Sequence, residues 1–383
     1  MIAPANRLQT VQEYYFSKKL REVGQMMQAG HPVINMGIGS PDLAPKKEVT
    51  AALDQALKHP KAHMYQSYQG LPEFRKAVAD FYKKYYQVTL DPQTEILPLM
   101  GSKEGIMHIS MAFLNPGDQV LVPNPGYPTY QSVSRLVEAE PVFYNLTERG
   151  GWQPDIEALS RLDTNKIKMM WLNYPHMPTG TDVDTAVFDQ LIEWAKDQNI
   201  LLVNDNPYSF VLTKNPHSIL SRPQAKEVAI ELNSLSKSFN MAGWRVGMVS
   251  GKESTIQSIL KVKSNMDSGM FYGIQKGAVA ALQADSSWFD SLNLVYKKRR
   301  VLIEQLAHSL GATFDPHSVG MFVWAKLPGE APDAETFIDQ ILHKKHIFIT
   351  PGTIFGSQGE GYIRFSLCVK ETIIEEAIKR LES

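Results

Sequence analysis

The feature that most constrains the fold is a series of short, mainly apolar segments between about residues 50 and 250. They are rich in β-branched and aromatic residues and cover residues 94–99, 119–122, 141–146, 167–172, 200–204 and 228–232. Turn residues and stretches with helical periodicity separate them. Because strands that are apolar on both faces are buried on both faces, this pattern predicts an α/β fold whose mostly parallel sheet is sandwiched by helices.

Segment 182–199 is the clearest predicted helix. Its apolar residues recur on one face, and Asp182 or Asp184 precedes them as a possible N-cap. Residues 10–29 also predict a helix, with a loose apolar stripe.

The pattern changes after about residue 285. A long helix rich in lysine and arginine comes first, followed by the predicted strands "MFVWAKLP", "HIFITPG" and "GYIRFSL" and by helices at about 333–343 and 371–382. This order predicts a smaller α+β domain. We expect a large cofactor-binding domain over 46–287, and a small domain formed by 1–45 and 288–383.

Composition excludes several classes of protein. The net charge of −1 provides no electrostatic footprint for nucleic acid, and we expect the basic run 297–300 to be one solvated helix face. Cys368 is the single cysteine, so no internal disulfide can form, which is consistent with a reducing compartment. The N-terminus has no apolar signal region, and no apolar run is long enough to span a membrane. We therefore expect a cytoplasmic protein.

Polar residues gather where the predicted strands end, which is where open α/β sheets bind ligands. Ser102 and Lys103 follow the first strand in "MGSKEGIMHIS", Tyr127 follows the second, and Asp205 and Tyr208 follow the fifth in "NDNPYSF". A glycine turn that opens a helix can bind an anion. Taken alone, each residue is more typical of a helix cap, a turn or an aromatic core than of a binding site.

The segment "NSLSKSFNMAGWRVG" changes that balance. Lys237 stands among three serines that include Ser234, and Arg245 lies between two glycines. Together with the other strand-end residues, they are what a pyridoxal phosphate site requires. The phosphate needs amides, hydroxyls and a guanidinium, the ring needs an aromatic face and a carboxylate partner, and the aldehyde needs a lysine.

The sequence resembles class I aminotransferases of the fold-type I pyridoxal-phosphate enzymes over nearly its whole length. "SLSKSFNMAGWRVG" is similar to the lysine motif of that family. The resemblance implies that Lys237 forms the Schiff base with the cofactor and that Ser234 and Arg245 hold the phosphate.

Other motifs extend the resemblance. "GSKEGI" resembles the phosphate loop, so Ser102 and Lys103 are expected to bind the phosphate through their backbone. "PGYPTY" implies that Tyr127 lies against the cofactor ring. "NDNPY" implies that Asp205 pairs with the pyridinium nitrogen and that Tyr208 donates to the phenolic oxygen.

Three further segments concern the substrate and a second subunit. "GIGSPD" and "YIRFSL" resemble the segments that bind the substrate α-carboxylate, which implies that Gly39 and Arg364 do so here. A guanidinium suits a carboxylate because it can donate two parallel hydrogen bonds. "YQSYQGLPEFR" resembles the segment whose first tyrosine, here Tyr65, reaches the phosphate of the neighbouring subunit, so we expect a homodimer with shared active sites.

One position departs from the family pattern. Where the family has an asparagine that donates to the phenolic oxygen, this chain has Met177, which cannot donate. Tyr208 would then be the main donor, with His176 or Asn173 as possible substitutes. Alternatively, Met177 packs against the substrate side chain. No metal site is assigned.

The resemblance implies a ping-pong transfer of an amino group between an L-amino acid and a 2-oxo acid. We expect glutamate and 2-oxoglutarate as one pair, with an aromatic, aspartate-type or diaminopimelate-type partner, since "KSNMDSGMFYGIQ" resembles diaminopimelate or broad-range enzymes. Candidate residues for the substrate pocket are Tyr14, Tyr15, Phe16, Ile38, Tyr68, Met177, Phe271 and Tyr272. The alternatives are a β-lyase or carbon–sulfur lyase on the same fold and a non-catalytic effector-binding domain.

Overall fold

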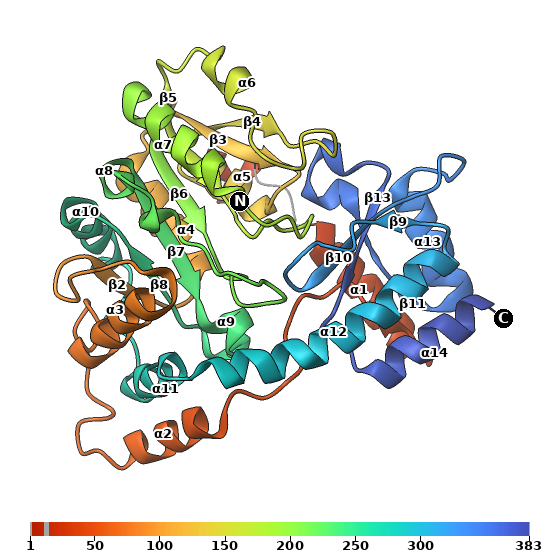
Figure 1. Cartoon of the computed structure of the whole chain (residues 1–383), viewed down its shortest axis with the longest axis horizontal. Coiled ribbons are helices and arrows are strands. Elements are labelled where there is room, and N and C mark those ends of the chain that lie inside the picture. Colours follow the sequence, from red (N-terminus) through yellow and green to blue (C-terminus); the bar gives the residue numbers. More distant parts are fainter. Residues whose placement is uncertain (1, 11–14, 383) are drawn as a thin grey trace.

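The computed structural model describes residues 2–10 and 15–382. Its centre is a seven-stranded sheet in the order β2-β8-β7-β6-β5-β3-β4 (Figure 1). The strands are β2 (Ile96–Leu99), β3 (Gln119–Asn124), β4 (Glu140–Asn145), β5 (Ile167–Leu172), β6 (Leu201–Asp205), β7 (Ala229–Ser234) and β8 (Gly247–Ser250). Neighbours run parallel except at β8, which is antiparallel to both β2 and β7. The predicted mostly parallel sheet is therefore confirmed, and β8 is a strand that the sequence reading missed.

Helices cover both faces of this sheet. One face packs against α3 (Pro72–Tyr86), α7 (Thr185–Gln198) and α11 (Tyr272–Leu282), and the other against α4 (Ser102–Phe113), α5 (Pro128–Leu136) and α10 (Glu253–Lys263). Successive residues of β5 belong to opposite cores, since Met170 packs in the first and Met169 in the second. This alternation is why the strands are apolar throughout.

Shorter elements complete this part of the chain. They are α2 (Lys47–Leu57), α6 (Ile156–Ser160), α8 (Ala225–Val228), α9 (Leu235–Ser238), and the 3-10 helices η2 (Ile219–Ser221) and η3 (Ala242–Trp244). Of the two possible N-caps of α7, Asp184 is the one used, because its side chain accepts a hydrogen bond from the amide of Ala186 at 2.9 Å.

The remaining elements surround two smaller sheets. One sheet has the order β12-β13-β10-β9 and is antiparallel, and the other pairs β1 with β11 in parallel. The strands are β1 (Ile34–Asn35), β9 (Thr313–Phe314), β10 (Phe322–Lys326), β11 (Ile347–Phe348), β12 (Thr350–Pro351) and β13 (Tyr362–Ser366). The helices are α1 (Tyr15–Gln28), α12 (Ser286–Ser309), α13 (Ala334–Lys345), α14 (Glu371–Glu382), η4 (Gly352–Phe355) and η5 (Ser357–Gly359). Pairing of β1 with β11 joins the N-terminal segment to the C-terminal part; the exact domain boundaries stay a prediction.

The long helix α12 extends from the large sheet to the smaller ones (Figure 1). Its basic run was expected to be one solvated face, and this expectation is wrong for half of it. Lys297 and Lys298 are exposed, whereas Arg299 and Arg300 are buried. Arg299 donates to both carboxylate oxygens of Asp42 at 2.7 and 2.9 Å. Arg299 also donates to the carbonyl of Leu367, and Arg300 donates to the carbonyl of Asp315 and the hydroxyl of Ser318, so both are buried against segments that follow the helix.

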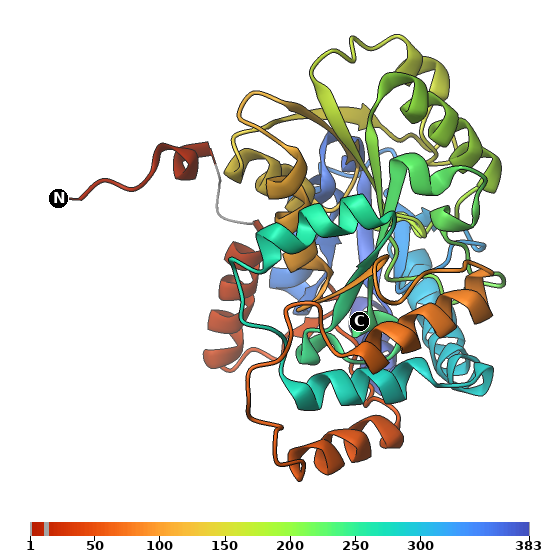
Figure 2. The same cartoon turned by 90° about the vertical axis from the view of Figure 1, so that its left-hand side faces the viewer.

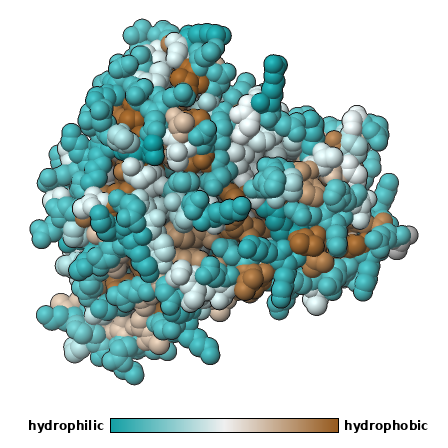
Figure 3. All heavy atoms as spheres, viewed as in Figure 1, coloured by the Kyte–Doolittle hydropathy of each residue, from teal (hydrophilic) through white to brown (hydrophobic). Residues whose placement is uncertain are grey.

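Residues 2–9, with the start of η1 (Asn6–Thr10), project from the body of the molecule (Figure 2). The face seen in Figure 1 is largely hydrophilic, with small separate hydrophobic areas (Figure 3). None of the described helices combines the length and the apolar character needed to cross a membrane.

Candidate active site

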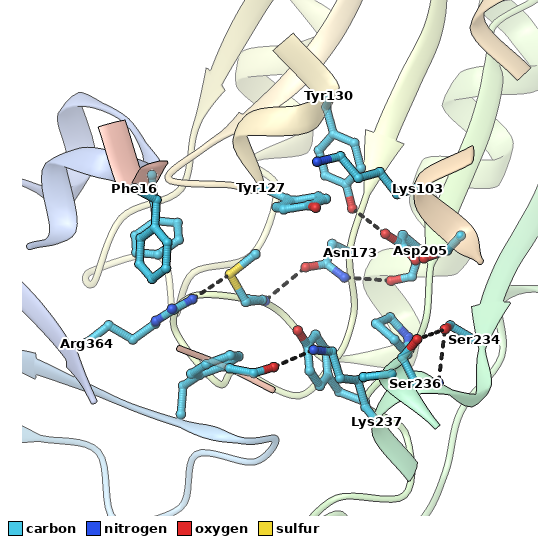
Figure 4. Close-up of a pocket in the computed structure, with 18 of the residues that line it drawn as sticks. Phe16, Lys103, Tyr127, Tyr130, Asn173, Asp205, Ser234, Ser236, Lys237 and Arg364 are labelled. Atoms are coloured by element: carbon cyan, nitrogen blue, oxygen red, sulfur yellow. Dashed lines mark hydrogen bonds between the residues drawn. The ribbon is translucent and has the colours of Figure 1, made fainter. Parts of the chain in front are cut away.

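A cavity of about 470 Å³ opens at the carboxyl ends of the central strands, where they face the smaller sheets. It brings together all the predicted site residues except Tyr65, namely Gly39, Ser102, Lys103, Tyr127, Asp205, Tyr208, Ser234, Lys237, Arg245 and Arg364. Tyr65 lies elsewhere, and its side chain is 89% exposed. Residues from segments more than 300 positions apart therefore share one cavity (Figure 4).

Lys237 lies on the short helix α9, directly after β7. Ser234 is the N-cap of this helix, and its Oγ accepts from the amide of Ser236 at 3.1 Å. Burial lowers the pKa of the Lys237 amine; the buried Cys368 opposes this shift, Arg364 and Arg245 add to it, and Asp205 opposes it more weakly. A lowered pKa increases the neutral, nucleophilic fraction of the amine.

The three serines around Lys237 have different surroundings. Ser234 and Ser236 line the cavity, and their hydroxyls are 2.8 Å apart. Ser238 instead donates to the carbonyl of Pro207 at 3.3 Å and is not a lining residue. Two of the three hydroxyls therefore lie at the cavity, where that of Ser234 donates to that of Ser236.

One end of the cavity is rich in hydrogen-bond donors and positive charge. Ser102 and Lys103 begin α4, whose N-cap Gly101 offers no side-chain cap. Gly101 has a φ of 90°, and a Cβ there would lie 2.3 Å from Nη2 of Arg245. The guanidinium therefore lies directly beside the free amides of the helix start, which is a favourable arrangement for a phosphate dianion.

Asp205, the last residue of β6, is buried, with one oxygen paired and one unpaired. Its Oδ2 accepts from the hydroxyl of Tyr130 at 2.9 Å, while its Oδ1 has no hydrogen-bond partner among the described residues (Figure 4). Burial raises the pKa of Asp205 to about 7, against the lowering effects of Tyr130 and Lys237. A buried, unpartnered carboxylate oxygen requires a donor, and a protonated ring nitrogen would satisfy it.

Two tyrosines flank this carboxylate. Tyr127 is the N-cap residue of α5, and its ring meets that of Tyr130 edge-on, with centroids 5.5 Å apart. Tyr208 follows β6, and burial raises the pKa of its hydroxyl well above the usual range. Both are therefore neutral hydroxyl donors at the cavity wall. Tyr130 was not among the predicted site residues, although it belongs to the motif "PGYPTY".

The two substitutes considered for the missing asparagine already have hydrogen-bond partners, although the amide nitrogen of Asn173 keeps a second hydrogen and Nε2 of His176 has no partner among the described residues. Asn173 donates to the carbonyl of Asp205 at 2.6 Å, and its Oδ1 accepts from the amide of Met177 at 3.0 Å. His176 does not line the cavity, its Nδ1 lies 2.8 Å from the hydroxyl of Thr179, and burial lowers its pKa to about 3. Asn173 instead connects the Met177 loop to β6.

Arg364, on β13, forms the other end of the cavity. Its guanidinium carbon lies 3.9 Å from the ring centroid of Phe322 and 4.6 Å from that of Phe355. It donates to the carbonyl of Gly37 at 2.8 Å and to Sδ of Met177 at 3.3 Å. These contacts hold the cation in a fixed orientation inside the cavity.

The residues proposed for the substrate pocket are only partly brought together. Phe16 and Met177 line the cavity. Ile38, Tyr68, Phe271 and Tyr272 do not line it in this single chain. Tyr14 and the side chain of Tyr15 lie outside the described part of the structure.

One cluster of potential metal ligands occurs among the described residues, formed by Glu104, His108 and Asp267. The ammonium of Lys263 lies 2.8 Å from Asp267 and already supplies a positive charge there. Glu104 and His108 lie on α4, and none of the three residues lines the cavity.

Comparisons with known proteins agree with this geometry. The family model described as aminotransferase class I and II matches residues 31–381. The LL-diaminopimelate aminotransferases of Aquifex aeolicus and Halothermothrix orenii are each 38% identical, covering 99% of this chain and 98% of the relative. Among solved structures, apo-BacF from Bacillus subtilis superimposes with a TM-score of 0.96 at 36% identity, covering 100% of this chain and 98% of that one.

These relatives favour a transaminase over the lyase and effector-domain alternatives, because the named curated relatives are all aminotransferases. The cavity brings together a lysine, a carboxylate and the start of helix α4. The chain therefore belongs to the class I and II aminotransferases and is a pyridoxal-phosphate-dependent enzyme that exchanges amino groups between amino acids and 2-oxo acids.

Proposed function

We propose that the cavity holds pyridoxal phosphate with its phosphate at the start of α4. Ser102 and Lys103 would bind it through backbone amides, Ser234 through its hydroxyl and Arg245 through its guanidinium. The close approach of Arg245 to Gly101 supports this assignment, because a side chain at that position would fill the space beside the guanidinium.

The ring end would be held by three residues. Asp205 would pair its Oδ1 with the ring nitrogen, Tyr127 would cover one ring face, and Tyr208 would donate to the phenolic oxygen. The unpartnered Oδ1 of Asp205 supports this orientation. When bound, pyridoxal phosphate supplies an aldehyde that captures the amino group and a ring that withdraws electrons from the α-carbon.

Lys237 would be the covalent anchor of the cofactor and the acid–base catalyst. Its amine, once free, can take the proton from the substrate α-carbon. The same amine can then donate a proton to the cofactor carbon that receives the amino group. The lowered pKa of the buried amine supports the role of base. Gly39 and Arg364 would hold the α-carboxylate, so that the α-carbon proton lies near Lys237.

The observation that carries this proposal is the meeting of Lys237, Asp205 and Arg364, from three different elements, in one cavity. The reaction would be a ping-pong exchange with glutamate and 2-oxoglutarate as one pair. LL-Diaminopimelate is the first candidate for the partner amino acid, because curated relatives 37–38% identical over almost the whole chain carry that name.

An amino acid with an aromatic side chain is the second candidate. Phe16, Phe322 and Phe355 line the Arg364 end of the cavity together with Met177. The other described cationic residues of the lining are Lys103, Lys237 and Arg245, which are assigned above to the cofactor. An apolar side chain therefore suits this end better than a second carboxylate does.

The test is a spectral titration of the purified holoenzyme with single amino acids in the absence of any oxo acid. Conversion of the visible cofactor band to the amine form by glutamate and by LL-diaminopimelate would support the first candidate. Conversion by phenylalanine or tyrosine but not by LL-diaminopimelate would replace it with the second. Release of ammonia with pyruvate, without the amine form, would refute transamination.

We also propose a homodimer in which Tyr65 reaches the phosphate site of the neighbouring subunit. Its exposure of 89% leaves the side chain available to a second chain. If the sites are shared, mixing the inactive variants Tyr65→Ala and Lys237→Ala should restore activity, since one mixed site contains neither change. No restoration of activity, or a fully active monomer in sedimentation, would contradict shared sites.

We also propose a cytoplasmic location, and domain boundaries at 45/46 and 287/288.

A further inference from the structure

We propose that Tyr130 is a positioning residue whose hydroxyl holds Oδ2 of Asp205, so that Oδ1 is left for the cofactor and the carboxyl keeps its charge. The inference rests on the role proposed above for Asp205. It assigns a function to a residue that does not itself need to touch the substrate.

The position of Tyr130 is fixed from two sides. Its side chain, in the first turn of α5, is fully buried, and its ring stacks on Trp171 of β5 with centroids 4.8 Å apart and an interplanar angle of 6°. Trp171 is itself fully buried. A ring held by such stacking has little rotational freedom, so its hydroxyl is preorganised at 2.9 Å from Asp205.

The direction of the hydrogen bond follows from the chemistry of the pair. Burial raises the pKa of Tyr130 well above its usual value, with a further contribution from the charge of Asp205, so the tyrosine stays protonated and donates. A hydrogen bond donated to a carboxylate favours its ionised form. Among the described residues, Tyr130 is the one side chain that donates a hydrogen bond to this carboxylate.

Other groups near Asp205 do not replace this contact. Lys237 favours the ionised carboxylate through charge alone, and Glu231, on the neighbouring strand β7, opposes it. Tyr127 and Tyr208 are neutral and have no recorded hydrogen bond to it. Without the Tyr130 hydroxyl, neither oxygen of the buried Asp205 carboxyl would accept a hydrogen bond from a side chain. The protonated form of Asp205 would then become more stable relative to the ionised form.

The experiment compares Tyr130→Phe with the matched variant Tyr144→Phe. Tyr144 is also buried, and its hydroxyl donates to the carbonyl of the same Trp171 at 2.7 Å, but it makes no recorded contact with Asp205. The dissociation constant of pyridoxal phosphate is measured from about pH 5 to about pH 9 by equilibrium dialysis, since Asp205 binds the cofactor only when it is ionised. Thermal unfolding of each apo variant reports whether it is folded.

We expect Tyr130→Phe to move the pH at which cofactor affinity is lost upward by about one unit or more, which is about tenfold weaker binding on the acid limb. Tyr144→Phe should keep the profile of the unmodified protein. Equal profiles for the two variants would overturn the role of Tyr130.

Asp205→Asn separates this failure from failure of the underlying proposal. If Asp205→Asn binds the cofactor with unchanged affinity and pH dependence, the role of Asp205 itself is wrong. If Asp205→Asn abolishes the acid limb, adding Tyr130→Phe to it should cause no further change in the profile. A full additional shift in the double variant would mean that Tyr130 does not act through Asp205.

Discussion

Replacing Gly101 with alanine should weaken cofactor binding while leaving the protein folded. The added Cβ would lie 2.3 Å from Nη2 and 2.9 Å from Cζ of Arg245, whereas ordinary contact begins at 3.4 Å. The guanidinium must therefore retreat by about 1 Å. Because the atoms that move are the far end of a flexible side chain, the clash itself costs little stability, but it displaces the donor assigned to the phosphate.

The substitution should have two separate effects, one on folding stability and one on cofactor affinity. Alanine at a φ of 90° costs about 1–2 kcal/mol of folding free energy, because an L side chain is strained in this region. Loss of a hydrogen bond to a charged group costs about 1.5–3 kcal/mol, so the dissociation constant of pyridoxal phosphate should rise about tenfold to hundredfold.

Gly117→Ala is the matched control. Gly117 has a φ of 85°, and a Cβ there would meet nothing within 4 Å. Both variants should lose similar stability in a thermal melt of the apo protein, and only Gly101→Ala should lose cofactor affinity in a fluorescence titration. Equal affinity in the two variants would refute the placement of the phosphate beside Arg245.

Three further outcomes follow from the same cavity. Lys237→Ala should still bind pyridoxal phosphate but lose turnover by orders of magnitude, and near-normal steady-state rates would overturn its catalytic role. Met177→Asn should add a second donor beside Tyr208 and lower the pH midpoint of the visible band of the holoenzyme; a spectral pH titration without a shift would leave Met177 as a packing residue. Asp205→Asn should stabilise the apo protein at about pH 8 but not near pH 4. The folded-state pKa of Asp205 is raised to about 7, so the folded chain binds more protons than the unfolded one between about pH 4 and 7 and loses up to about 4 kcal/mol of stability as pH rises through that window. Melting curves with the same pH dependence for both proteins would contradict this.

Much of the architecture could be read from periodicity. Continuous apolar segments separated by helical stretches predicted the parallel strands, because burial on both faces imposes that composition. The antiparallel β8 was missed, because its four residues, Gly247–Ser250, follow directly on the lysine–arginine motif and have no local pattern of their own. The basic run of α12 was misread for a related reason, since Asp42, which pairs with Arg299, lies more than 250 positions away.

The sequence by itself determined the chemical inventory of this protein: a lysine among hydroxyls, a carboxylate at a strand end, and glycine turns that open helices. These signals are local, and motif spacing preserves them. Only the tertiary structure decided which groups are already engaged. It showed that Ser238 donates away from the cavity to Pro207, that Asn173 donates to the backbone carbonyl of Asp205, and that Tyr130 donates to the carboxylate of Asp205. Hydrogen-bond partners and burial depend on contacts between distant segments, so no local pattern can specify them.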